Sequence, residues 1–129
     1  TEQEIDGVAY VFSESGVARE ANSALGEGIA EAALAQLGAS QDCTMLVTNA
    51  LAANGIYYHG WPVGYLSLGT VTNDPQPGDL IYYADGGLGM AHIAVYIGNG
   101  QAVHGGWHGS GTMIYSAYVG SGPVFIHVE

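Results

Sequence analysis

The segment from His92 to His104 constrains the fold of this chain more than any other stretch. Aliphatic residues occupy every second position from Ile93 to Ile97, and the mixed positions between them begin with His92. This period of two is typical of a β-strand whose two faces meet different surroundings. Gly98-Asn99-Gly100 then supplies a turn, and a second short apolar run ends at His104. The segment therefore predicts a β-hairpin.

The length of the hairpin loop decides which face His104 occupies. A loop of two residues pairs Gly98 with Gln101 and turns His104 onto the aliphatic face. A loop of three residues, with Gly100 in a left-handed conformation, pairs Ile97 with Gln101 and turns His104 onto the mixed face. We predict the three-residue loop.

That choice brings two histidines together. His104 then lies opposite Ala94 and diagonal to His92, at a Cα separation of roughly 7–8 Å, where side chains interact. The small side chain of Ala94 leaves room for a helix to approach between the two imidazoles.

The single cysteine of the chain, Cys43, is expected to begin a helix. It opens an apolar run that starts after Asp42, a favoured N-cap, and stops at Asn54-Gly55. Free N–H groups and the helix dipole at such a position lower the pKa of a thiol and make it a nucleophile. The alternative is that Cys43 is a small buried apolar residue.

The remaining pattern predicts an α+β fold, in which the helix that bears Cys43 packs on an antiparallel sheet of about five strands. A first helix is expected at 28–37, with Gly38 at its C-terminal cap. The strands are expected at 79–84, 92–97, 101–104, 113–118 and 123–128. Residues 55–78 form an irregular aromatic loop that either lines a substrate groove or covers the core. Residues 1–22, with a short strand at 8–12, form an arm or linker, and 23–129 form the catalytic domain.

The charge of the chain excludes some classes of partner. At 129 residues it fits one domain, and twelve acidic residues against one basic residue, Arg19, give a net charge of −11. Binding to nucleic acid or to an anionic membrane surface needs clustered Lys and Arg, so neither partner is expected. No signal peptide is visible, and we expect a fragment of a larger protein or a domain delivered by another module.

Cys43 and the two hairpin histidines together supply the parts of a thiol hydrolase. Cys43 is the candidate nucleophile, and His92 is the candidate general base that later protonates the leaving amine. His104 orients the His92 ring, and the Cys43 N–H is one candidate donor to the oxyanion. No metal or other cofactor is expected, although the same three side chains are possible zinc ligands. Their spacing matches no closed zinc motif.

Three segments, in this order and spacing, resemble the NlpC/P60 family of cysteine peptidases. They are Asp42-Cys43 at a helix start, Pro77-Gly78-Asp79-Leu80 before a strand, and His92–Gly100 with His104 twelve residues after His92. The resemblance runs from about Gly28 to the C-terminus. It implies a papain-like core and an endopeptidase that cuts peptidoglycan stem peptides, typically between D-γ-glutamate and a diamino acid such as meso-diaminopimelate. It also implies that Cys43, His92 and His104 form the triad and that Asp42 binds the free amine of the substrate.

The chain departs from the family pattern on both sides of Cys43. Thr44-Met45 follows the cysteine in place of Ser-Gly, and the tyrosine usually found just upstream has no counterpart. We expect Thr44 to contact substrate and Tyr57 or Tyr58 to replace that tyrosine.

Two other functions remain possible from the sequence, and the resemblance also implies a location. Cys43-Thr44 also resembles the related CHAP amidases and peptidases, which is the first alternative. The second alternative is a non-catalytic module that binds cell wall or a protein. The resemblance implies an extracellular or cell-envelope location, in a secreted bacterial protein or a phage lysis or tail protein. His108 is expected in an exposed loop, and His59 and His127 have no partner that the sequence identifies.

Overall fold

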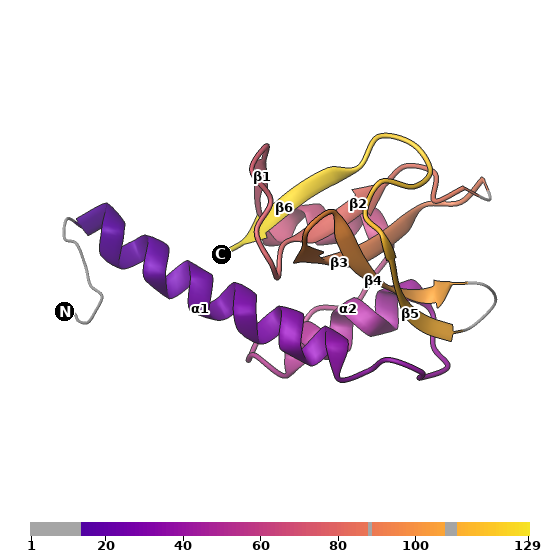
Figure 1. Ribbon diagram of the computed structural model, residues 1–129, viewed down its shortest axis with the longest axis horizontal. Helices are drawn as coiled ribbons and strands as arrows, with labels where there is room; N and C mark the ends of the chain where they lie inside the picture. Colours follow the sequence, from indigo (N-terminus) through magenta and orange to yellow (C-terminus); the bar gives the residue numbers. More distant parts are fainter. Residues whose placement is uncertain (1–13, 88, 108–110) are drawn as a thin grey trace.

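The computed structural model describes residues 14–87, 89–107 and 111–129 and contains one six-stranded antiparallel sheet with two helices on one face (Figure 1). The strands are β1 Gly69–Thr72, β2 Leu80–Tyr83, β3 His92–Gly98, β4 Gln101–Trp107, β5 Gly111–Ser116 and β6 Val124–Val128, in the order β1-β6-β2-β3-β4-β5. The predicted α+β fold is confirmed. The unpredicted strand is β1, a four-residue edge strand that follows a 3₁₀ helix, η1 Pro62–Leu68, within the aromatic segment.

Helix α1, Glu14–Leu34, begins fourteen residues before the predicted start at 28 and ends three residues before the predicted end at 37. Gly28, the predicted first residue of this helix, and Gly26 both lie inside α1. A Cβ at Gly26 would lie 2.6 Å from the carbonyl oxygen of Pro77, and one at Gly28 would overlap the side chain of Asn54. These glycines allow close packing rather than a chain break. The helix crosses the predicted boundary between 22 and 23, and the strand expected at 8–12 lies outside the described residues.

Helix α2, Cys43–Ala52, confirms the predicted helix and its N-cap. The Asp42 side chain accepts a hydrogen bond from the N–H of Met45, in the geometry that satisfies a free donor of the first turn. At the other end, Asn54 Nδ2 donates to the carbonyl of Ala50, and Gly55 has a φ of 84°. Asn54-Gly55 therefore ends the helix as the sequence indicated.

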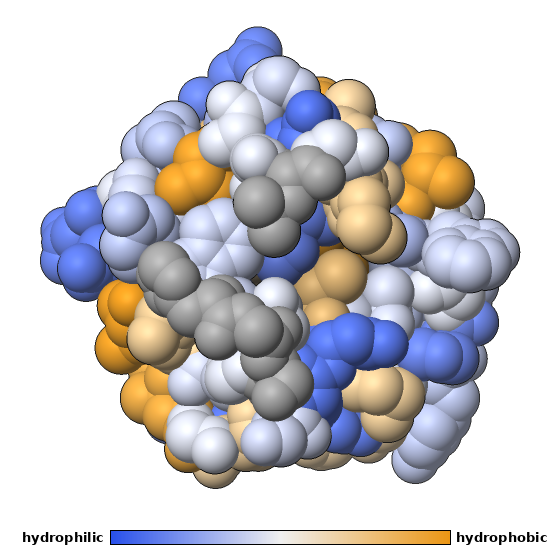
Figure 2. Space-filling view, turned by 90° about the vertical axis from the view of Figure 1, so that its right-hand side faces the viewer, coloured by the Kyte–Doolittle hydropathy of each residue, from blue (hydrophilic) through white to orange (hydrophobic). Residues whose placement is uncertain are grey.

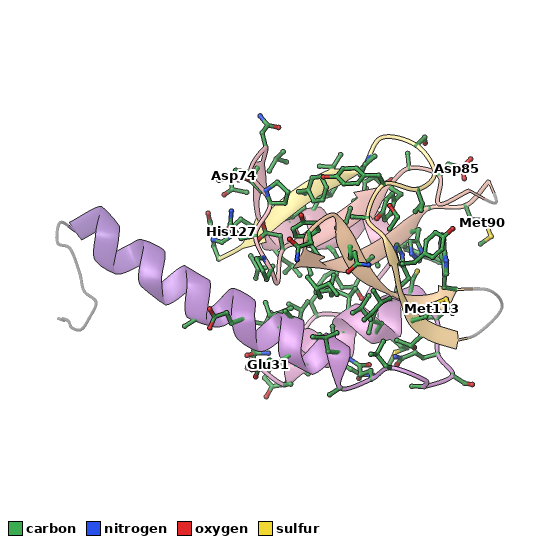
Figure 3. The ribbon with its side chains drawn as sticks, in the orientation of Figure 1. Glu31, Asp74, Asp85, Met90, Met113 and His127 are labelled. Atoms are coloured by element: carbon green, nitrogen blue, oxygen red, sulfur yellow. The ribbon has the colours of Figure 1, made fainter. Side chains whose placement is uncertain are left out.

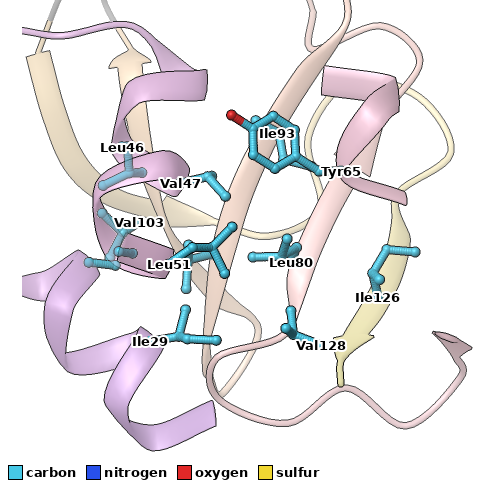
Figure 4. Packing of buried hydrophobic residues seen from close by; sticks show 13 residues of the cluster. Ile29, Leu46, Val47, Leu51, Tyr65, Leu80, Ile93, Val103, Ile126 and Val128 are labelled. Atoms are coloured by element: carbon cyan, nitrogen blue, oxygen red, sulfur yellow. The ribbon is translucent and has the colours of Figure 1, made fainter. Parts of the chain in front are cut away.

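The main core lies between the two helices and one face of the sheet (Figure 4). Helix α2 contributes Leu46, Val47, Ala50 and Leu51, all fully buried. The sheet contributes aliphatic side chains from four strands, namely Leu80, Ile93, Val95, Val103, Ile126 and Val128. Burial of such side chains stabilises a fold by roughly 1.5–3 kcal/mol each, so this layer fixes α2 against β3 and β4.

The β3–β4 hairpin combines features of both loop alternatives. Gly98 pairs with Gln101, so the predicted pairing of Ile97 with Gln101 is wrong. Asn99 and Gly100 have φ values of 56° and 74°, which suit a tight two-residue turn. The register then shifts between Tyr96 and Gly98, a β-bulge that restores the register of the three-residue alternative.

Because of that bulge, Val95 pairs with Val103, and continuation of this register places His104 across from Ala94, as predicted. The approach of the helix was predicted on the wrong face. Ala94 belongs to a second buried cluster, with Ile81, Tyr83, Tyr96, Ala102 and Ala117, on the side of the sheet away from α2. Helix α2 packs on Ile93 and Val95 because those aliphatic residues cover its apolar side.

Candidate active site

Two clefts meet at Cys43, and each takes its name here from one histidine in its wall. The His92 cleft has a volume of about 680 Å³ and is lined by Cys43, His92, Trp107 and Tyr115 among others. The His59 cleft has a volume of about 740 Å³ and is lined by Cys43, Thr44, His59 and Trp61 among others. Asp42, Cys43, Met90 and Ala91 line both. Met90 lies at the end of the molecule that faces the viewer in Figure 2, where hydrophilic and apolar surface adjoin (Figures 2 and 3).

Two glycines of β4 let the start of α2 approach the sheet beside His104. A Cβ at Gly105 would lie 2.8 Å from both the carbonyl oxygen of Asp42 and the Cβ of Leu46. Gly106, with a φ of 62°, has the backbone nitrogen of Cys43 3.2 Å from its Cβ position. The close approach at these two glycines was not predicted from the sequence. Gly105-Gly106 directly after a histidine was the available signal.

Replacement of Gly105 by alanine is expected to damage both stability and activity. The new methyl group collides with backbone, so α2 must move away from β4, at a cost of about 1–3 kcal/mol. A displacement of Cys43 by about 1 Å reduces turnover by about a hundredfold. Urea unfolding and steady-state hydrolysis measure the two effects. Gly111→Ala is the matched control, because the new Cβ would lie at an ordinary 3.5 Å from the Trp107 carbonyl oxygen. Equal behaviour of the two variants would contradict the prediction.

The two hairpin histidines form a directed chain of hydrogen bonds. His104 Nε2 lies 2.9 Å from the carbonyl oxygen of Ser116, which only accepts, so Nε2 carries the proton. Neutral His104 then presents a lone pair at Nδ1, which lies 2.9 Å from His92 Nε2. His92 Nε2 therefore donates. The remaining nitrogen of neutral His92, Nδ1, is left with a lone pair and is the candidate base.

The surroundings keep both imidazoles neutral. Their rings stack with centroids 5.2 Å apart, and the ring of Trp107 lies 4.6 Å from His104 and 5.1 Å from His92. Burial lowers the pKa of His92 to about 4, with a further contribution from His104, and burial also lowers the pKa of His104. The tautomers assigned above therefore hold at neutral pH.

Burial also raises the pKa of the Cys43 thiol, and the neighbouring Asp42 carboxylate raises it further. Hydrogen bonds from the backbone N–H groups of Ile93, Cys43 and Thr44 oppose this shift but are weaker. The expectation of a lowered thiol pKa at the helix start is therefore wrong for the free protein. The thiol and the imidazole of His92 are both neutral at pH 7.

The rate of alkylation of Cys43 by iodoacetamide is expected to be low at pH 7 and to rise only above about pH 9, because burial raises the pKa of this thiol above its ordinary value. The thiolate reacts and the thiol does not, and a raised pKa keeps the thiolate scarce until that pH. Mass spectrometry follows Cys43 alone, because the chain has one cysteine. Asp42→Asn keeps the cap and removes the negative charge, so its rate profile should shift to lower pH. Fast labelling of the unchanged chain at pH 6 would contradict this prediction.

The side chains of the predicted substrate residues Asp42 and Thr44 are joined by a hydrogen bond. Asp42 Oδ1 accepts from the hydroxyl of Thr44 and from the N–H of Met45, both at 2.8 Å, and the Met45 bond is the main cause of the lowered pKa of Asp42. Thr44 is buried, and its hydroxyl proton is committed to this bond. The Thr44 hydroxyl therefore supports the helix cap, although Thr44 also lines the His59 cleft. The backbone N–H of Thr44 lies close enough to the same carboxylate to lower its pKa as well.

The two tyrosines proposed as replacements for the missing upstream tyrosine line neither cleft. Tyr57 is 82% exposed, and Tyr58 packs edge-on against the buried ring of Tyr65 at a centroid distance of 4.9 Å. The aromatic loop does reach the site through other members, because His59 and Trp61 line the His59 cleft. The role predicted for Tyr57 or Tyr58 therefore stays a prediction, and neither tyrosine lines a cleft at Cys43.

His127 lies apart from this arrangement, and the triad side chains do not form a zinc site among the described residues. His127 Nδ1 contacts the buried carboxylate of Asp79 at 2.8 Å and lies at the end of the sheet away from Met90 (Figure 3). His108 lies outside the described residues. Within the described ranges, no three His, Cys, Asp or Glu side chains converge on a common point for a metal ion. His92 Nε2 and His104 Nδ1 bond each other and so do not face a shared ligand.

Several solved structures share this fold. The first is NlpC1 from Trichomonas vaginalis, with 25% sequence identity and a TM-score of 0.65, over 79% of this chain and 43% of that chain. A hypothetical invasion protein of Mycobacterium tuberculosis, Rv1477, has 19% identity and a TM-score of 0.69 over 86% of this chain and 65% of that one. The P60 domain of an M. avium paratuberculosis antigen has 19% identity and a TM-score of 0.69 over 88% of this chain and all of that one.

This chain thus spans less than two-thirds of the first two proteins and the whole of the third. A comparison with curated proteins found no match. The model of the NlpC/P60 family matches residues 26–122, which include Cys43, His92 and His104. The match covers more than half of the sequence, and the chain belongs to the NlpC/P60 family.

Proposed function

We propose that this domain is a cysteine peptidase that hydrolyses a peptide bond in the stem peptides of bacterial peptidoglycan. Members of the NlpC/P60 family are generally cell-wall peptidases. The observation that carries the proposal for this chain is the directed chain from the Ser116 carbonyl through His104 to His92. It leaves a basic nitrogen on His92 in the cleft that also contains the thiol of Cys43.

Catalysis then starts from the neutral thiol of Cys43 and the neutral imidazole of His92. His92 Nδ1 takes the thiol proton as Cys43 Sγ attacks the carbonyl carbon, and the resulting oxyanion accepts a hydrogen bond from the Cys43 N–H. The imidazolium returns its proton to the leaving amine when the C–N bond breaks, which leaves a thioester. Water then attacks the thioester, His92 Nδ1 removes its proton, and the acid product leaves with the thiol restored. His104 holds the His92 ring through both steps.

The proposed bond is the one between D-γ-glutamate and the diamino acid of the stem peptide. Asp42 supports this choice, because its carboxylate caps α2 and is also exposed in the wall of both clefts, where it can bind the free ammonium of an N-terminal alanine. The His92 cleft contains Trp107 and Tyr115, which suit the aliphatic chain of the departing diamino acid.

Asp42→Asn is expected to weaken hydrolysis of a peptide with a free N-terminal amine by about tenfold relative to the same peptide with an acetylated amine. A charge-assisted hydrogen bond is worth roughly 1.5–3 kcal/mol, and this carboxylate is exposed, so the lower end applies. Asparagine caps a helix as well as aspartate does, so the comparison isolates the charge. The ratio of kcat/KM for the two peptides is the measurement. An unchanged ratio would show that Asp42 is only a cap.

Digestion of purified peptidoglycan tests the proposal as a whole. The unchanged protein should release fragments with a new amino terminus on the diamino acid, identified by mass spectrometry, and the Cys43→Ala variant should release none. Cleavage at the amide between the glycan and L-alanine would support the CHAP-like alternative. Binding without cleavage would support the non-catalytic alternative.

A location outside the cytoplasm and delivery by another module complete the proposal. Family members are commonly associated with the cell wall or secreted. No helix in the described part of the chain is long and apolar enough to cross a membrane. A net charge of −11 would repel anionic wall polymers, so a separate wall-binding module would bring the domain to its substrate.

A further inference from the structure

The proposed reaction places a positive charge on a buried imidazole whose triad partner carries no charge. His92 becomes an imidazolium when it takes the thiol proton of Cys43, and burial opposes that charge, because it lowers the pKa of His92 to about 4. In a Ser-His-Asp triad, a carboxylate next to the histidine stabilises the imidazolium. Here the neighbour is His104, which burial keeps neutral and which offers a lone pair at 2.9 Å. The positive charge therefore needs a further source of stabilisation.

The titratable groups around the cleft have other partners. Cys43 on α2 and Tyr115 on β5 line the His92 cleft. The Asp42 carboxylate lies in the cleft wall and accepts from the first turn of α2. Asp85 accepts from the backbone N–H groups of two glycines in the loop before β3. Both carboxylates thus bind backbone N–H groups of their own segments.

Trp107 presents its ring to both imidazoles of the triad. The ring centroids are 5.1 Å apart for His92 and 4.6 Å apart for His104, and the planes are inclined by 42° and 30°. The face of an indole is the best aromatic partner for a cation, and the attraction acts within about 6 Å of the ring centroid. Tyr83 of β2 adds a second ring, 5.5 Å from His92, and its hydroxyl donates to a backbone carbonyl.

The fold holds the indole ring beside the histidines. Trp107 is the last residue of β4, where it pairs with Gly111 of β5, and its ring packs against Tyr115 at a centroid distance of 5.8 Å. It is half-buried and lines the His92 cleft. Attraction between a charge and a ring is stronger where water is excluded, so this position favours a large effect.

We propose that Trp107 is a positioning residue that stabilises the protonated form of His92 through the face of its indole ring. This inference rests on the proposed function and adds a residue to its machinery. The proton moves from Cys43 Sγ to His92 Nδ1 and then to the leaving nitrogen, and Trp107 gains and loses no atom. The ring attracts the imidazolium more than the neutral imidazole, so the interaction strengthens as the barrier is approached, which is the condition for catalysis.

Tryptophan analogues with one, two or three ring fluorines test this role in the complete protein without a change of side-chain shape. Fluorine withdraws electron density from the ring face, and the whole interaction is worth about tenfold, so each fluorine should lower kcat for the stem tripeptide by about 1.5-fold. The pKa of His92, followed by nitrogen NMR without substrate, should fall with each fluorine. The chain has two tryptophans, Trp61 and Trp107. The matched control is therefore Trp107→Phe grown with the same analogues, in which neither quantity should depend on fluorine.

Trp107→Leu measures the whole interaction. Leucine keeps an apolar cover but has no ring face, so kcat should fall by about tenfold, and Trp107→Phe should fall less because it keeps a ring. Urea unfolding of both variants corrects for lost packing.

The outcomes separate this inference from the proposed function. If kcat and the pKa of His92 do not depend on fluorine while the tripeptide is cleaved, Trp107 only packs on the histidines; the inference is overturned and the peptidase assignment stands. A dependence that persists in Trp107→Phe would originate at Trp61 and would also overturn it. If no stem peptide is cleaved but the pKa of His92 falls with each fluorine in the unchanged chain alone, the interaction stands and the peptidase assignment fails.

Discussion

Replacement of Cys43 by alanine is expected to reduce hydrolysis of L-Ala-γ-D-Glu-diaminopimelate by roughly 10⁴-fold or more, because removal of a nucleophile that acts as a unit with its base removes nearly all covalent catalysis. Cys43 lies where α2, β3 and β4 meet, and it opens onto both clefts. No other cysteine exists to replace it. The measurement is kcat/KM, and the masses of the products identify the bond that is cut.

The Cys43→Ser variant is the matched comparison. It keeps the size of the side chain and a proton to transfer, but the hydroxyl is a much weaker nucleophile than a thiol. Burial lowers the pKa of His92 to about 4, so the base that would have to activate that hydroxyl is weak as well. Both variants should retain the circular dichroism spectrum and urea midpoint of the unchanged protein. Residual activity above one part in about a hundred in the alanine variant would show that another group is the nucleophile.

Replacement of His104 by alanine is expected to lower kcat by about 10²–10⁴-fold and to change KM little, because loss of the orienting member of a triad leaves the base in the wrong tautomer. In the unchanged protein, His104 Nδ1 accepts from His92 Nε2 and so keeps the lone pair of His92 on Nδ1. Without that acceptor, the proton of His92 is free to occupy Nδ1, where it blocks transfer from Cys43.

His104→Asn distinguishes orientation from packing. Its side-chain oxygen lies close to the position of the imidazole Nδ1 and accepts a hydrogen bond, so activity should recover by about tenfold or more over alanine. Nitrogen NMR of His92 should report a proton on Nε2 in the unchanged and asparagine proteins and a mixture in the alanine protein. His104 is fully buried, so unfolding curves of both variants are needed to account for the cavity. A kcat within threefold of the unchanged value in a folded alanine variant would contradict the orienting role.

The sequence by itself determined the elements that depend on local patterns. Asp42 before an apolar run specified the start of α2, because a side-chain acceptor satisfies the free N–H groups of the first turn. The alternation after His92 specified β3, and the resulting order of two helices and antiparallel strands identified the fold class. Asp42-Cys43, Pro77–Leu80 and the segment His92–His104 were visible in the sequence, and their order and spacing resembled the NlpC/P60 family, which the family match confirms.

Tertiary structure decided whatever depends on contacts between distant segments. The first helix was predicted to start at Gly28, yet α1 extends back to Glu14, and Pro77 and Asn54 pack against Gly26 and Gly28 inside it. The pKa of Cys43 rises because burial between the helix and the sheet outweighs the backbone N–H groups that its local sequence supplies. His59 joins the wall of a cleft at Cys43 only because the aromatic loop folds against Thr48 of α2. Burial, desolvation and convergence of charges are set by three-dimensional neighbours, and sequence periodicity carries no record of them.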